Sequence, residues 1–228
     1  MPHRKRSESM LAPFEHIIID AMLERVPVSI RCEHLTLMTV LWSAAALITS
    51  ALARQSVRWL WATSLIIACQ YVTDCLDGKV GVQRNAGLAE WSYYMDHLLD
   101  YVFLCSLLIG YSTLLPSHLQ FLMLPMLSIA GGFMVSSFLA CHVTGELRIS
   151  FIGIGPAEVR LTFIAINTLL ATYGQPYMVR TIPYIIIAAF VALAALVIQT
   201  QRDLWTAHKR RQMSEQGQEV AAGIVRLQ

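Results

Sequence analysis

The chain has 228 residues, of which 56% are hydrophobic and only 14% are charged. Soluble domains are about a quarter charged, so this composition excludes a disordered chain and argues against a soluble globule. The net charge of +2 gives no basis for a nucleic-acid partner. The five cysteines are scattered without a Cys-x-x-Cys pair, so neither a disulfide framework nor a zinc site is indicated. The sequence therefore predicts an integral membrane protein.

The first element expected along the chain is a two-faced helix over residues 14–25. Its apolar residues recur at steps of three and four, while its acidic residues fall elsewhere. Such a helix can lie in the lipid headgroup layer or pack on protein, and the pattern leaves both open. The apolar positions are Phe14, Ile17, Ile18, Ala21 and Met22, and the acidic ones are Glu15, Asp20 and Glu24.

Six apolar stretches follow, each close to the roughly 20 residues that a membrane span needs. Lipid-embedded backbone must satisfy its own hydrogen bonds, so these stretches are expected to be helices. We predict an all-α integral membrane protein with six transmembrane helices preceded by an N-terminal amphipathic interfacial helix. The chain divides into a cytoplasmic or interfacial segment over residues 1–34, a six-helix transmembrane domain over 35–200 and a polar cytoplasmic tail with a short helix over 201–228. The stretches are Leu35–Leu52, Val57–Thr73, His97–Leu115, Leu119–Cys141, Val159–Tyr173 and Thr181–Gln199.

The distribution of lysine and arginine predicts the orientation, because these residues gather in cytoplasmic segments. With the N-terminus in the cytoplasm, fourteen of the 17 basic residues lie on the cytoplasmic side. Only Arg54, Arg58 and Arg180 fall in the outer loops. We therefore expect a multi-pass protein with both termini cytoplasmic, of the kind found in a bacterial inner membrane.

Four of the six aspartates gather at the cytoplasmic end of the second stretch and the start of the third. Within each pair the spacing is three or four residues, which places both carboxylates on one helix face. Four bare carboxylates near hydrocarbon would repel one another strongly, and one or two divalent cations would relieve this. Oxygen-only ligands favour Mg²⁺ or a similar hard ion such as Mn²⁺. The four residues are Asp74, Asp77, Asp96 and Asp100.

Two other interpretations of these aspartates fit the sequence less well. A single acidic residue at the boundary of a span is usually a solvated flank, but four at helical spacing fit that explanation poorly. A transporter with the aspartates as a cation path would place them near the bilayer midplane, whereas these four gather at one face. Gly78 and Gly81, expected in the loop after the second stretch, would let a ligand approach the backbone closely.

The stretch from Asp74 to Asp100 resembles the signature of the CDP-alcohol phosphotransferases. That signature reads D-x2-D-G-x2-A-R, then eight or nine residues, then G-x3-D-x3-D. All four aspartates and Gly78 fall in register with a nine-residue spacer. Two positions depart from it, since Gly81-Val82 replaces Ala-Arg and Ser92 replaces the second glycine. The lost arginine removes a positive fork near phosphates, for which Arg84 or Lys79 is the expected substitute.

The resemblance implies an enzyme of phospholipid synthesis, in which an acceptor hydroxyl attacks the β-phosphoryl group of a CDP-alcohol and CMP leaves. By position, Asp74, Asp77 and Asp96 would hold two Mg²⁺ or Mn²⁺ ions, and Asp100 would share in this and act as general base. The nucleotide would lie along Gly78, Gly81, Lys79 and Arg84. The resemblance also implies a lipid or small-alcohol acceptor and a homodimer.

The segment between the fourth and fifth stretches faces the same side as the aspartates. Its Gly155-Pro156-Ala157-Glu158 resembles the Gly-Pro-Thr-Glu of choline and ethanolamine phosphotransferases. Arg148, Glu158 and Arg160 are the candidates for acceptor binding, although a salt-bridged helix start explains the last two equally well. Because the signature arginine is missing, a catalytically weak or silent relative that binds CDP-lipid or nucleotide stays open as the alternative function.

Overall fold

The computed structural model describes residues 19–84, 89–144 and 156–225. These parts are helical apart from short connections, and none of their residues forms a strand, so the predicted all-α fold is confirmed there. The elements are α2 (Cys32–Leu52), α3 (Trp59–Gln83), α4 (Ala89–Ser112), the 3-10 helix η1 (Ser117–Leu122), α5 (Met123–Thr144), α6 (Pro156–Tyr173) and α7 (Gln175–Val225).

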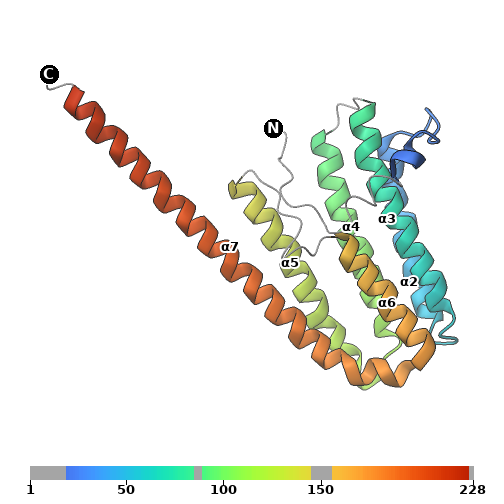
Figure 1. Cartoon of the computed structure of the whole chain (residues 1–228). Helices are drawn as coiled ribbons and strands as arrows, with labels where there is room; N and C mark the ends of the chain where they lie inside the picture. The colour runs from blue at the N-terminus through green and yellow to red at the C-terminus, as the bar shows by residue number, and fades with distance from the viewer. Residues whose placement is uncertain (1–18, 85–88, 145–155, 226–228) are drawn as a thin grey trace.

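The helices form two groups that meet at α4 (Figure 1). In the first group, α2 packs against both α3 and α4, and α3 packs against α6. In the second group, α5 packs against α7, and α5 also contacts α4. The first group carries the four aspartates of α3 and α4, so the packing of α2, α3, α4 and α6 positions the site.

All six apolar stretches are helical, but α3 and α4 reach further into the aspartate region than predicted. The expected loop at Gly78 and Gly81 was wrong, because α3 continues to Gln83. Leu76 and Val80 of this extension are buried in an apolar cluster with Leu35. This packing outweighs the weak helix propensity of the two glycines. All four aspartates therefore lie on helices rather than beside a loop.

Three helical segments are long and apolar enough to cross a membrane: Cys32–Leu52, Ser117–Cys141 and Met178–Lys209. They correspond to the first, fourth and sixth predicted spans. The other helices, α3, α4 and α6, carry charged residues such as Asp74, Asp100 and Arg160 within their length. Six transmembrane helices are therefore not confirmed, because charged side chains lie within three of the helices expected to span the membrane.

The last helix is longer than the predicted sixth span. Instead of a separate short helix after Gln201, α7 runs on continuously to Val225, over 51 residues. At 1.5 Å per residue this is roughly 75 Å, far more than one bilayer crossing. Gly174 separates it from α6 with a φ of 81°, a left-handed conformation that suits glycine at a helix end.

The N-terminal segment is described from residue 19, so the start of the predicted helix lies outside the described residues. Residues 19–23 are helical. Ile19 is buried against Leu35, Leu76 and Val80. Of the two readings of this helix, its described part fits packing on protein, directly over the end of α3.

A close contact fixes α2 beside α4. A Cβ atom placed on Gly110 would lie only 2.7 Å from the Cβ of Ser50, a separation that real side chains do not reach. The hydroxyl of Ser50 is turned back to the carbonyl of Ala46 in its own helix. Glycine at position 110 is therefore needed for the two helices to approach this closely.

Candidate active site

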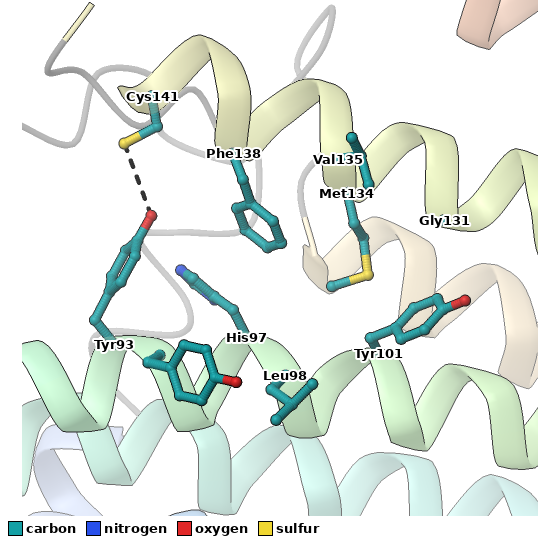
Figure 2. Close-up of a pocket in the computed structure, with 10 residues that line it drawn as sticks. Tyr93, His97, Leu98, Tyr101, Gly131, Met134, Val135, Phe138 and Cys141 are labelled. Atoms are coloured by element: carbon teal, nitrogen blue, oxygen red, sulfur yellow. Dashed lines mark hydrogen bonds between the residues drawn. The ribbon is translucent and has the colours of Figure 1, made fainter. Parts of the chain in front are cut away.

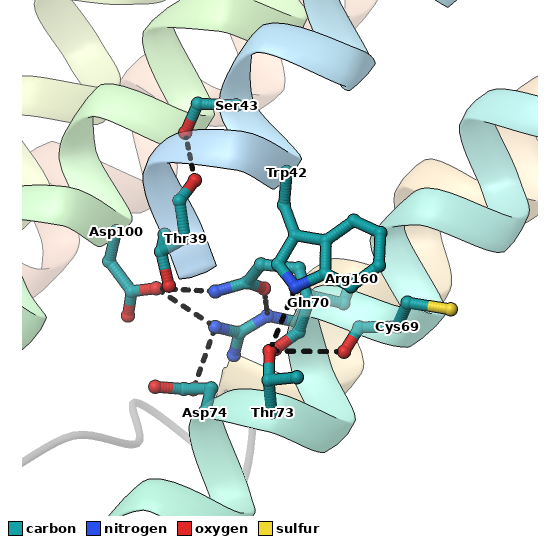
Figure 3. Close-up of polar contacts among 9 residues, drawn as sticks. All are labelled: Thr39, Trp42, Ser43, Cys69, Gln70, Thr73, Asp74, Asp100 and Arg160. Atoms are coloured by element: carbon teal, nitrogen blue, oxygen red, sulfur yellow. Dashed lines mark hydrogen bonds and ion pairs between the residues drawn. The ribbon is translucent and has the colours of Figure 1, made fainter. Parts of the chain in front are cut away.

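Carboxylates from two helices converge on one arginine where α3, α4 and α6 meet (Figure 3). Nη2 of Arg160 on α6 lies 2.8 Å from Oδ2 of Asp74 and 3.0 Å from Oδ1 of Asp100. Because a single nitrogen contacts both, the two carboxylates face a common point. Asp96, one turn before Asp100 on α4, lies near enough to Asp74 for the charge of Asp74 to raise the pKa of Asp96. Three predicted aspartates are thus brought together.

Gln70 and Tyr71 hold the arginine in this position. The fully buried side chain of Gln70 donates from Nε2 to Oδ1 of Asp100 at 3.0 Å and accepts from Nε of Arg160 at 2.9 Å. The guanidinium carbon of Arg160 lies 5.0 Å from the centre of the Tyr71 ring, a distance typical of a cation–π contact. Arg160 is therefore fixed on three sides, with its side chain only 11% exposed.

Asp77 lies one turn beyond Asp74 on α3 and is only 3% exposed. Its Oδ2 accepts a hydrogen bond of 2.6 Å from the hydroxyl of Thr36 on α2. Its Oδ1 is buried and has no hydrogen-bond partner among the described residues. A buried carboxylate oxygen without a partner is costly, so this atom is a natural place for a donor or a cation to bind.

Burial raises the pKa of both Asp77 and Asp96. Both residues lie just outside the expected membrane spans Val57–Thr73 and His97–Leu115. The pKa of Asp77 reaches about 6, with the hydrogen bond from Thr36 opposing the shift and the charge of Asp74 adding to it. For Asp96, the charges of Asp74 and Asp100 raise the pKa further. Burial and the neighbouring carboxylates thus oppose ionisation of Asp77 and Asp96, whereas a bound cation would favour their charged forms.

The four aspartates fit the predicted divalent ion in their chemistry but not in their present arrangement. In the described part of the chain, no three His, Cys, Asp or Glu side chains are placed so that they could hold a metal ion. Asp74 and Asp100 turn to Arg160 instead. The ligand atoms nevertheless suit a hard ion, because all of them are oxygens. One of them, Oδ1 of Asp77, has no hydrogen-bond partner among the described residues. The carboxylates thus have the chemistry that such an ion needs, although two of them, Asp74 and Asp100, contact Arg160.

The family model for CDP-alcohol phosphatidyltransferase matches residues 32–201, which include α2 to α6 and the apolar part of α7. The chain belongs to this family. Its activity is therefore of the class that transfers a phosphatidyl-type group from a CDP-alcohol, and it is a membrane protein with three clearly apolar helices. The comparison with curated proteins finds no match.

The two cations expected to replace the arginine of the family signature make other contacts. Arg84 donates from both terminal nitrogens to main-chain carbonyls within residues 26–30. Lys79 pairs with Asp20 at 2.5 Å. Both side chains therefore fasten the N-terminal segment to the end of α3, and their part in nucleotide binding stays a prediction. The cation that does contact the signature aspartates is Arg160.

The predicted glycines differ in what surrounds them. A Cβ on Gly78 would meet no atom within 4 Å, so the backbone beside Asp77 is open to a ligand. A Cβ on Gly81 would lie 3.7 Å from Cys32, which is ordinary packing contact. Val82, at the place of the signature arginine, is 81% exposed. Nucleotide binding by both glycines stays a prediction, and the open surface supports it better at Gly78.

Of the residues proposed for the acceptor, Arg160 lies at the centre of the cluster, and Glu158 lies in the first turn of α6. Arg148 lies outside the described residues. Sequence reasoning missed Gln70 and Thr36. Gln70 had a signal, since it precedes Asp74 by four residues and so shares its helix face. Thr36 had none, because its contact with Asp77 joins positions far apart in the chain.

An apolar cavity of about 570 Å³ lies on the other side of α4, between it and α5 (Figure 2). His97 lines it and stacks on Phe138 with ring centres 5.0 Å apart. His97 is therefore packed between α4 and α5. Tyr101, next to Asp100 in sequence, also lines the cavity. α4 thus presents carboxylates to α3 and α6 and an apolar surface to α5.

Proposed function

We propose that this family member is catalytically active and transfers a phosphoalcohol group from a CDP-alcohol to an acceptor hydroxyl, with release of CMP. The observation that carries the proposal is the meeting of Asp74, Asp96 and Asp100 from two helices, beside the unpartnered Oδ1 of Asp77. Carboxylates gathered in one region, in register with the family signature, are hard to explain as a structural feature, since they repel one another.

Asp74, Asp77, Asp96 and Asp100 are the proposed ligands of two Mg²⁺ or Mn²⁺ ions. Such ions neutralise charge on the diphosphate and so supply the electrostatic part of phosphoryl transfer. The protein contributes position: Thr36 holds one oxygen of Asp77 and leaves the other for a ligand. The open surface at Gly78 gives the nucleotide room beside these carboxylates.

Asp100 is the proposed general base. In the described structure, its contacts with Gln70 and Arg160 are both made through Oδ1, so we assign Oδ2 as the proton acceptor. The acceptor hydroxyl gives its proton to this oxygen while its own oxygen forms a bond to the β-phosphorus. The bond between that phosphorus and the oxygen of CMP breaks, and CMP leaves with the electron pair.

The cavity between α4 and α5 supports a lipid as one reactant, because its apolar lining adjoins the helix that carries Asp96 and Asp100. CDP-diacylglycerol with a small polyol or phosphorylated acceptor is our first choice. CDP-choline or CDP-ethanolamine with diacylglycerol is the second, supported by the resemblance around Glu158. The charge bias of the loops supports cytoplasmic termini, and the largely uncovered apolar surfaces of α5 and α7 leave room for a homodimer.

The test is release of CMP by the purified full chain. The protein is incubated with Mg²⁺, labelled CDP-diacylglycerol or CDP-choline, and a panel of acceptor alcohols. We expect CMP release that depends on one acceptor class and disappears with EDTA. Failure of every donor and acceptor pair, with nucleotide binding retained, would favour the silent relative that the replacement of Ala-Arg by Gly81-Val82 suggests.

A further inference from the structure

Arg160 occupies the place in this site where positive charge is needed. It contacts Asp74 and Asp100 through one nitrogen and is held by Gln70 and the Tyr71 ring. Among the described residues, no other lysine or arginine pairs with any of the four aspartates of the cluster. Arg160 is thus the counterion that joins two of these carboxylates.

The same contacts conflict with the binding of a divalent ion. A cation held by Asp74 and Asp100 would lie where both carboxylates now face the guanidinium. Two positive groups within about 4 Å of each other repel in a partly buried site, where solvent screens them less than in bulk water.

From this conflict we infer that Arg160 is an exchangeable counterion. It holds Asp74 and Asp100 together before a divalent ion binds and gives up these contacts when the ion takes its place. The inference rests on the proposed metal-dependent function and adds a positioning residue to it. Once released, the guanidinium stays in the site as a positive fork suited to phosphate. It thereby serves in place of the arginine that Val82 has replaced.

The first experiment uses the unaltered chain in detergent micelles. Phenylglyoxal modifies accessible guanidinium groups, and mass spectrometry locates each modified arginine. Addition of Mg²⁺ alone should raise modification of Arg160 several-fold. Arg84 is the internal control, because its contacts with the carbonyls of residues 26–30 do not involve the aspartates, and its modification should not change. Unchanged or reduced modification of Arg160 would overturn the inference.

The second experiment measures Mn²⁺ binding by the electron paramagnetic resonance signal of the free ion. Arg160→Gln removes the competing charge and should tighten Mn²⁺ binding about tenfold. Arg160→Lys keeps a charge but cannot bridge two carboxylates in the same way, so its affinity should lie between the two. Arg180→Gln is the matched control, an exposed arginine on α7, and should bind Mn²⁺ like the unaltered chain.

The outcomes separate the inference from the function on which it rests. Equal or weaker Mn²⁺ binding by Arg160→Gln, with Asp74→Asn still abolishing binding, would overturn the exchange and leave the metal site standing. Absence of any Mn²⁺ binding that Asp74→Asn removes would overturn both. Should Arg160→Gln fail to fold, because it leaves the carboxylates without a counterion, the modification experiment on the unaltered chain decides.

Discussion

Two polar clusters join the same three helices at two levels of the bundle, and they differ in charge. In the neutral cluster, the hydroxyl of Tyr111 donates to Oδ1 of Asn167 at 2.7 Å, and Nδ2 of Asn167 donates to the hydroxyl of Ser64 at 3.1 Å. All three residues are buried. In the charged cluster, Arg160 joins Asp74 to Asp100, whose side chain is 27% exposed.

The comparison separates a structural role from a functional one. The neutral cluster matches each described donor with an acceptor, which is what an apolar interior requires. The charged cluster sets one guanidinium against several carboxylates and leaves Oδ1 of Asp77 buried without a described partner. We therefore expect substitutions in the charged cluster to affect turnover, and those in the neutral cluster to affect stability.

The largest effect is expected from Asp100→Asn. The amide cannot accept the hydroxyl proton, and loss of a general base lowers turnover roughly 10²–10⁴-fold. CMP release measures this, while nucleotide binding should persist because the other carboxylates remain. Asp203→Asn on α7 is the matched control and should keep full activity. Normal turnover by Asp100→Asn would remove Asp100 from the role of base.

Asn167→Leu should lower the stability of the protein and leave its turnover nearly unchanged. It leaves the hydroxyls of Tyr111 and Ser64 buried without their partner, a loss of about 1–3 kcal/mol. Denaturant unfolding in detergent micelles measures this change. CMP release per folded molecule should stay close to that of the unaltered chain. A large fall in turnover at unchanged stability would contradict the division between the two clusters.

Much of this arrangement could be predicted from local sequence patterns. The six apolar stretches predicted the helices, and the spacing of the four aspartates predicted a shared site, of which the structure brings Asp74 and Asp100 together at Arg160. The extension of α3 through Gly78 and Gly81 could not be predicted, because it depends on packing of Leu76 and Val80 against residues near the N-terminus. The pairing of Arg160 with Asp74 and Asp100 was also missed, since it depends on how α6 packs against α3.

Tyr111→Phe should have a smaller effect than Asn167→Leu. It removes only the hydroxyl that donates to Asn167, and the ring keeps its packing beside Phe163, with centres 6.1 Å apart. Interhelical hydrogen bonds in membrane proteins contribute about 0.6 kcal/mol on average, so the unfolding free energy should fall by about that amount. A loss equal to that of Asn167→Leu would mean that the tyrosine, rather than the asparagine, organises the cluster.

The smallest effect is expected from Lys79→Gln, which extends the comparison to an ion pair at the surface. Lys79 and Asp20 are 26% and 63% exposed, whereas Arg160 and its partners are largely enclosed. Exposed pairs contribute only about 0.2–1 kcal/mol and are screened by salt. Unfolding of Lys79→Gln and of the unaltered chain should therefore converge as salt is added. A larger, salt-independent loss would show that this pair, like the Arg160 contacts, acts as an anchor, here holding the N-terminal segment on the end of α3.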